Sequence, residues 1–97
     1  MFKELDSILH SQLRLAIMSL LMNSGEINFT LLKEKTKASA GNLSIQVNKL
    51  KEAGYIEVTK KFKDNYPETS CKITHEGKEA FAKYEEAIQS YFHIKNN

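Results

Sequence analysis

Residues 38–58 read ASAGNLSIQVNKLKEAGYIEV, and this stretch decides the fold because a helical pattern runs through a glycine directly into a strand pattern. Four apolar residues recur at helical spacing and define one buried stripe: Ala40, Leu43, Val47 and Leu50. Ser39 is suited to cap the first turn, and Gly54 can supply the left-handed residue that ends the helix. The sequence therefore predicts a helix with well-marked ends.

The opposite face of this helix is rich in amides and poor in acidic residues. The residues that fall there are Gly41, Asn42, Ile45, Asn48, Lys49 and Glu52. A short helix over residues 28–35 precedes it, so residues 28–53 are expected to form a helix-turn-helix. In that arrangement the second helix is able to enter the major groove of DNA.

After Gly54 the periodicity changes from helical to alternating, which predicts strands. Ile56 and Val58 point to one side of the first strand. Residues 64–68, DNYPE, include the only proline of the chain and predict a turn. Residues 69–74 return as the partner strand, so residues 55–74 are expected to form an antiparallel hairpin.

Both ends of the chain carry helical patterns. Residues 2–9 predict a short helix, and Ser11 is expected to cap a second helix, so that two N-terminal helices occupy residues 1–24. Residues 26–28 predict a short strand. A long C-terminal helix is expected over residues 75–93. Its apolar band is wider than one small core needs and consists of Ala80, Phe81, Tyr84, Ala87, Ile88, Tyr91 and Phe92.

Length and composition limit the possibilities further. A chain of 97 residues and 11.1 kDa has room for one core, so we expect a single domain over residues 1–97. The apolar stretch of residues 15–22 falls far short of the roughly 20 residues that span a membrane. The start MFKELDS lacks the pattern of a secretory signal. These features predict a cytoplasmic protein without a membrane partner.

The charge is unevenly distributed. The formal net charge is only +2, but residues 33–72 contain nine lysines against five acidic residues, which gives +4. The remaining residues carry five basic and seven acidic groups, which gives −2. A positive centre is expected of a module that contacts phosphates through helices and a hairpin. Charge alone favours ordinary solvation by lysine, and only the coincidence with the helix-turn-helix favours phosphate contact.

The segment GNLSIQVNKLKEAGYIEV, the lysine-rich hairpin and KITHEGKEAF together resemble small winged-helix transcriptional regulators of the MarR/ArsR kind. The upstream segment HSQLRLAIMSLL resembles their first core helix, so the resemblance covers nearly the whole chain. It implies a mainly α fold with a small β-hairpin, in which a three-helix core carries a wing and terminal dimerisation helices. It also implies a homodimer that binds double-stranded DNA at a palindrome, with repression by steric exclusion of polymerase.

Residues of the polar helix are the candidates for reading bases, because Asn and Gln pair with adenine and an apolar side chain can contact a thymine methyl group. They are Asn42, Ser44, Ile45, Gln46 and Asn48. Candidates for phosphate contact are Ser39, Lys37, Lys49, Lys60, Lys61, Lys63 and Lys72. The hairpin lacks the arginine that such wings often insert into the minor groove. The sole arginine, Arg14, lies in the first core helix and is expected to anchor structure.

The surplus apolar residues of the two ends are the candidates for a dimer interface. They are Phe2, Leu5, Leu9, Phe81, Tyr84, Ile88, Tyr91 and Phe92. No metal, cofactor or catalytic group is predicted: the three histidines and Cys71 have no ligand spacing, and no nucleophile motif is present. Cys71 is expected to be a small buried hydrophobe.

Two other functions remain open at this level. The main alternative is a winged-helix adaptor in which the exposed helix and Ile45 bind another protein, and nonspecific DNA architecture is a third and weaker possibility. A solvated polar helix face is the simplest alternative for the amides. The sequence does not identify an operator, target genes, the sign of regulation or a small-molecule effector.

Overall fold

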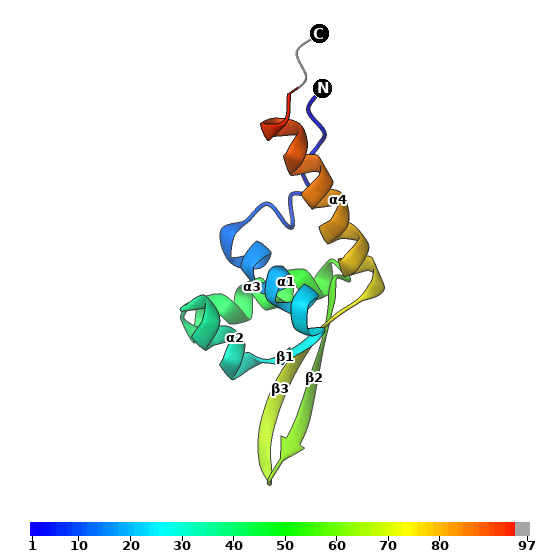
Figure 1. The fold of residues 1–97 in the computed structure, drawn as a ribbon. Coiled ribbons are helices and arrows are strands. Elements are labelled where there is room, and N and C mark those ends of the chain that lie inside the picture. Colours follow the sequence, from blue (N-terminus) through cyan, green and yellow to red (C-terminus); the bar gives the residue numbers. More distant parts are fainter. Residues whose placement is uncertain (95–97) are drawn as a thin grey trace.

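A computed structural model describes residues 1–94 and has a winged-helix fold (Figure 1). In chain order the elements are α1 (Gln12–Ser24), β1 (Glu26–Asn28), α2 (Phe29–Thr36), α3 (Ala40–Glu52), β2 (Ile56–Lys63), β3 (Tyr66–Ile73) and α4 (His75–Phe92). The strands form one antiparallel sheet in the order β1-β3-β2. The predicted class, a mainly α protein with a small hairpin, is confirmed, as is the short strand β1.

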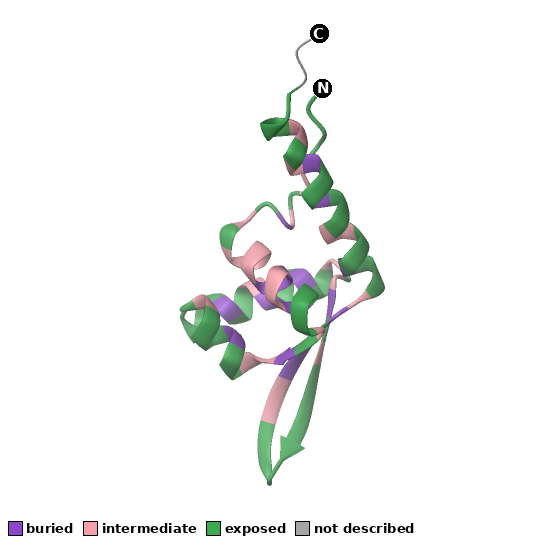
Figure 2. Cartoon of the chain, in the orientation of Figure 1, coloured by how far each residue is buried: buried purple, intermediate pink, exposed green. Residues whose placement is uncertain are grey.

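The core lies where α1, α2 and α3 pack against the base of the sheet, and the tip of the hairpin and most of α4 are exposed (Figure 2). The largest fully buried side chains are Leu9, Ile17, Met18, Leu21, Leu32, Leu43, Leu50 and Cys71. Each of the three helices and the sheet contributes to this set. The predicted stripe of α3 is buried as expected except for Ala40, which is exposed because it occupies the first turn, at the edge of the core.

Local signals set both ends of α3. The Ser39 hydroxyl accepts a hydrogen bond from the Asn42 backbone N–H at 3.2 Å, which caps the helix as predicted. Gly54 follows the helix with φ of 81°, a left-handed conformation that costs glycine no steric energy. Asn28 caps α2 in the same way, accepting from the Leu31 N–H at 2.7 Å. The helix-turn-helix is therefore defined by side chains close in sequence.

The hairpin turns more tightly than predicted. Asp64 and Asn65 alone form the turn, with φ of 53° and 68°, so it is a two-residue turn of the kind that matches the twist of paired strands. The prediction of a turn over residues 64–68 was wrong, since Tyr66 and Pro67 already belong to β3. Asp and Asn tolerate left-handed backbone, and two residues therefore suffice.

The N-terminal segment is not a helix, and the prediction for residues 2–9 was wrong. The carboxylate of Asp6 accepts hydrogen bonds from the N–H groups of Ile8 and Leu9 at 2.8 and 3.3 Å, and its carbonyl oxygen accepts from the His10 N–H at 2.8 Å, so these residues form a single local turn. Before this turn the chain runs alongside α4. Ser11 precedes α1 in extended conformation, but its side chain makes no capping hydrogen bond.

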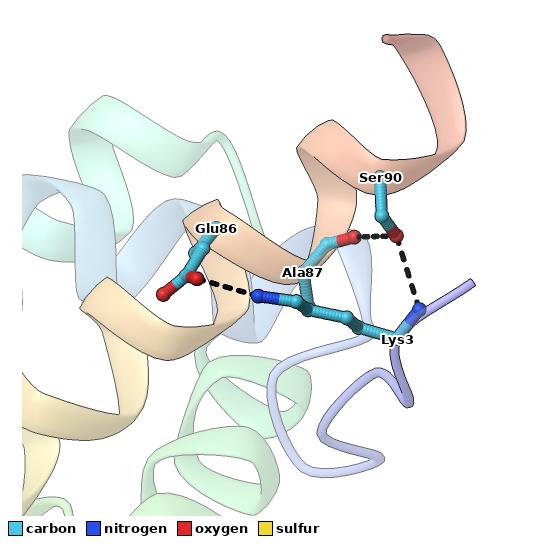
Figure 3. Close-up of polar contacts among 4 residues, drawn as sticks. All are labelled: Lys3, Glu86, Ala87 and Ser90. Atoms are coloured by element: carbon cyan, nitrogen blue, oxygen red, sulfur yellow. Dashed lines mark hydrogen bonds and ion pairs between the residues drawn. The ribbon is translucent and has the colours of Figure 1, made fainter. Parts of the chain in front are cut away.

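Contacts with α4 hold this segment in place (Figure 3). The Lys3 N–H donates to Ser90 Oγ at 3.1 Å, and Lys3 Nζ forms an ion pair with Glu86. Tyr91 donates its hydroxyl to the Lys3 carbonyl at 2.9 Å. This pairing has a sequence separation of more than 80 residues, so no local pattern predicts it.

Helix α4 projects away from the core, and the N-terminus lies at its far end, opposite the wing (Figure 1). The molecule is elongated, measuring 62 × 25 × 21 Å, with a radius of gyration of 15.1 Å against about 13 Å for a compact chain of this length. No helix among residues 1–94 is long and apolar enough to cross a membrane.

Candidate nucleic-acid interface

The outward face of α3 is open to solvent. Asn42, Ser44 and Asn48 are exposed, and Ile45 keeps 56% of its surface accessible although it is apolar and β-branched. The buried residues of α3, Leu43, Val47 and Leu50, occupy the other side. The helix thus presents a mixed polar and apolar face without any acidic residue in its first three turns.

One flank of this face borders the hairpin. A recess of about 560 Å³ is lined by residues of α2, α3 and the hairpin: Phe29, Gly41, Ser44, Ile45, Val47, Asn48, Lys51, Val58, Lys60 and Thr69. Three of the predicted base-reading residues therefore share a surface with the predicted phosphate-binding Lys60. Asn48 Nδ2 lies 3.5 Å from the Glu52 carboxylate. The side-chain oxygen of Asn48, Oδ1, takes no part in this contact.

The other flank borders α1, where Arg14 contacts Gln46. Arg14 Nη1 donates to Gln46 Oε1 at 2.5 Å, and Gln46 Nε2 donates to Asn42 Oδ1 at 3.2 Å. Arg14 Nε also donates to the Ile8 carbonyl at 2.5 Å, which confirms the predicted anchoring role. No sequence pattern predicts the hydrogen bond between Arg14 and Gln46, because the two residues are 32 positions apart and only the packing of α1 on α3 brings them together.

The hairpin lysines divide between the two faces of the sheet. Lys60 lies on the same face as Val58 and faces the recess beside α3. Lys61 lies on the other face, where its ammonium is 3.3 Å from Glu26 Oε2. Lys72 also lies there, paired in register with Glu26 and Glu57. Lys60 is therefore the hairpin lysine with the clearest access to a ligand bound on α3.

Lys37, Lys49 and Lys63 are also exposed. Lys37 occupies the turn between α2 and α3 with φ of 59°, whereas Lys63 alternates with Lys61 along β2 and so lies on the opposite face of the hairpin from Lys60. The side-chain oxygen of Ser39 already accepts the capping hydrogen bond. Its hydroxyl proton remains available as a donor, because that bond uses only a lone pair.

Cys71 is buried between the strands and the helices, as predicted. Burial raises the pKa of its thiol to about 11, so it is protonated near neutral pH. Within the described residues no group of three His, Cys, Asp or Glu side chains is arranged to hold a metal ion.

A separate recess of about 600 Å³ lies between the N-terminal segment and α4, away from the outward face of α3. At its edge the Tyr55 hydroxyl donates a hydrogen bond to the Asp6 carboxylate. Burial raises the pKa of Tyr55 to about 12, with a further contribution from this hydrogen bond and from the negative charge of Asp6. His10 Nδ1 lies 2.9 Å from the Tyr84 hydroxyl nearby.

Two of the residues predicted for a dimer interface are unavailable to a partner. Leu9 is fully buried in the core, and Tyr84 is only 7% exposed, because the N-terminal segment folds over α4 of its own chain. Leu5, Phe81 and Ile88 are half-buried against the core. Of the predicted set, Phe2, Tyr91 and Phe92 are exposed at the far end of α4, where Ile94 is exposed too, and the ring of Phe2 stacks on that of Tyr91 with centroids 5.0 Å apart.

A three-helix core, a recognition-type helix and a two-stranded wing define a winged-helix nucleic-acid-binding domain. Residues 13–92 match the family described as "Winged helix DNA-binding domain", and the chain belongs to this family. It is 36% identical over 77 residues to the uncharacterized protein MJ0432 of Methanocaldococcus jannaschii, a match that covers 79% of this chain and 84% of that protein.

Solved structures agree with this assignment. The transcriptional regulator homologue from Pyrococcus horikoshii OT3 superposes with a TM-score of 0.83 at 25% identity, over 88% of this chain and 84% of that one. A mutant MarR from E. coli in complex with operator DNA has the same fold, with a TM-score of 0.69 at 15% identity, over 86% of this chain and 58% of that one. The chain is thus a DNA-binding winged-helix protein that resembles transcriptional regulators, and that fold is typically non-enzymatic.

Proposed function

We propose that this protein is a cytoplasmic, sequence-specific transcriptional regulator that binds a palindromic operator as a homodimer, with residues 1–97 acting as one DNA-binding unit. The observation that carries the proposal is the exposed face of α3, where Ile45 lies among amide and hydroxyl side chains and beside the lysine-bearing wing. The structural likeness to the Pyrococcus horikoshii regulator homologue supports it.

In this mechanism α3 enters the major groove with its outward face against base edges. Asn42, Ser44 and Asn48 supply hydrogen bonds, and Ile45 supplies apolar contact with a thymine methyl group. The lysines around α3 and on the wing contact phosphates, which orients the helix without reading sequence.

A two-fold dimer would place two α3 helices about 34 Å apart, one turn of DNA, so that each reads half of a palindrome. A dimer seated on a promoter excludes polymerase, and we therefore assign the protein as a repressor. The E. coli MarR structure has a similar fold and was solved in complex with operator DNA, which supports the DNA-binding part of this proposal.

Selection of binding sites from random duplex DNA tests the proposal, followed by mobility shifts at roughly 50 and 200 mM salt with unrelated competitor DNA. A palindromic motif and a fall in affinity of about 10³- to 10⁵-fold between the two salts are expected if 6–10 phosphates are neutralised. Salt-sensitive binding without a motif would indicate DNA architecture. No DNA binding at either salt would favour the alternative, a protein-interaction adaptor.

A further inference from the structure

The contact between α1 and α3 has a consequence for how the amides of α3 are oriented. Arg14 carries only hydrogen-bond donors, because a guanidinium has five N–H groups and no acceptor. The atom of Gln46 that faces Arg14 must therefore be the carbonyl oxygen Oε1. The amide nitrogen of Gln46 must then point the other way, toward Asn42.

The same reasoning fixes Asn42. Gln46 Nε2 donates, so the atom 3.2 Å away on Asn42 has to be the carbonyl oxygen Oδ1. The NH₂ group of Asn42 is left facing outward, on an exposed residue of the helix. The orientation of both amides thus follows from the chemistry of Arg14, independently of which way each amide is drawn.

Arg14 is itself held in place. Its Nε donates to the Ile8 carbonyl and its Nη2 lies 3.5 Å from the Ser7 carbonyl, both in the N-terminal segment. Arg14 as a whole is half-buried, so its rotamer is constrained by packing as well as by these bonds. Gln46 is half-buried and has both ends of its amide engaged.

We propose that Arg14 and Gln46 are positioning residues that set Asn42 as a hydrogen-bond donor to a base, and that Gln46 does not read a base itself. This inference rests on the proposed function, since it concerns the base that α3 selects. An outward NH₂ group suits the major-groove acceptors of guanine, N7 and O6, or the O4 of thymine. It disfavours cytosine, whose edge offers a donor, and the bidentate adenine pairing in which Asn also uses its oxygen.

Gln46→Glu is the deciding variant. The new carboxylate still accepts from Arg14 but has no N–H to give, so Asn42 turns its NH₂ group toward Glu and its oxygen toward the DNA. Sites selected from random DNA should keep the rest of the motif. One position in each half-site should change from guanine or thymine to cytosine or adenine, with discrimination of about 5- to 150-fold in each protein.

Two control variants make the result specific. Asn42→Ala should remove the preference at that one position, and adding Gln46→Glu to it should change nothing further. Gln89→Glu makes the same charge change on an exposed residue of α4 and should leave the motif intact. An added negative charge lowers affinity for every DNA sequence. Base preferences are compared within one protein, so this general loss of affinity does not affect the result.

Two outcomes would overturn the inference. The first is an unchanged motif in Gln46→Glu. The second is the loss of a further motif position when Gln46→Glu is added to Asn42→Ala, because Gln46 would then read a base itself. A wild-type protein that selects no motif would instead overturn the proposed function. In that case NMR of the protein without DNA tests the hydrogen bonds from Arg14 to Gln46 and from Gln46 to Asn42. The side-chain NH₂ resonances of Asn42 and Gln46 should both shift in Arg14→Lys. Unshifted resonances would show that no such network exists.

Discussion

Gly77 approaches the backbone of Tyr55 so closely that a β-carbon at Gly77 would lie 2.2 Å from the Tyr55 carbonyl oxygen. The same oxygen accepts a hydrogen bond from the Thr74 N–H at 3.0 Å. The Thr74 hydroxyl donates to the Gly54 carbonyl at 2.7 Å and accepts from the Gly77 N–H at 3.0 Å. These contacts fix the first turn of α4 on the junction between α3 and β2, and so set the direction in which α4 leaves the core.

Gly77→Ala should therefore destabilise the protein. The added methyl group meets backbone that cannot move without disturbing the junction, and overpacking of this kind costs about 1–3 kcal/mol. Gly41→Ala is the matched control, because a β-carbon there has nothing within 4 Å. In the first turn of α3 it should be neutral or raise the free energy of unfolding by up to about 1 kcal/mol. Urea denaturation followed by circular dichroism measures both, and equal effects of the two changes would contradict this account.

The sequence predicted the elements whose ends are set locally. Ser39 and Gly54 mark the two ends of α3 through their own side chain and backbone, so a single stretch of sequence contains the information. The position of the hairpin was predicted correctly, but the length of its turn was not. Asp64 and Asn65 both have left-handed φ angles, yet in the sequence they are only two polar residues and do not distinguish a two-residue turn from a longer one.

The elements that depend on distant contacts were not predictable. The apolar spacing of the N-terminal segment suits a helix, yet Lys3 pairs with α4 and Asp6 bonds to Tyr55 and to its own turn. In the candidate site, the amide face was found from periodicity alone. That Gln46 is tied to Arg14 depends on the packing of two helices, which no local pattern encodes.

The stability of the protein should fall at high pH through Tyr55. Its pKa is raised from 10.0 to about 12 in the folded protein, so the folded state retains a proton that the unfolded state loses. The stabilisation is fully present below about pH 10 and is lost as the pH rises toward 12. Urea denaturation from pH 8 to 12 should show the stability advantage of wild type over Tyr55→Phe shrinking across this window. A difference that stays constant with pH would mean that Tyr55 does not keep its proton.

Ile45 should discriminate thymine from uracil in the operator. Its side chain is 56% exposed, and burial of one methyl-sized group against it is worth about 0.8 kcal/mol, or roughly fourfold in affinity. Replacing thymines one at a time by deoxyuridine should reveal one position in each half-site where wild type loses this factor and Ile45→Ala does not. Melting of Ile45→Ala should be nearly unchanged, because the residue lies outside the core. Equal losses at every position in both proteins would exclude the contact.

The hairpin lysines should differ in their effect on DNA binding. Lys60→Ala should weaken binding to all sequences alike and reduce the slope of log K against log salt by about 2 in the proposed dimer, since each of the two subunits loses one phosphate contact and each contact releases about one counterion. Lys61→Ala should have a smaller effect because Lys61 already pairs with Glu26 on the other face of the wing. Lys83→Ala, a change beside the recess under α4, is the control and should leave the slope unaltered. Titrations at four salt concentrations give the slopes, and a larger effect of Lys61 than of Lys60 would reverse the assignment of the DNA-facing side.

The far end of α4 should join two copies of the chain. Phe2, Tyr91, Phe92 and Ile94 form an exposed apolar cluster at the end of the molecule opposite the wing, and Phe92 alone is 74% exposed. An isologous two-fold contact would cover both copies of this cluster and leave no open surface for further growth. Sedimentation at micromolar concentration should therefore give about twice the 11.1 kDa mass of the chain.

Phe92→Glu tests this contact, because it places a charge in the cluster without touching the core. It should produce monomers and weaken operator binding by about 10²- to 10⁴-fold through loss of the second half-site. The melting temperature of the variant should stay near that of wild type diluted until it dissociates into monomers. Phe62→Glu is the matched control for oligomeric state, since Phe62 is an aromatic residue of 80% exposure on the wing. That variant should remain dimeric. If wild type sediments as a monomer, or if Phe92→Glu remains a dimer, the end of α4 is not the interface and the two half-sites of an operator must be bridged in another way.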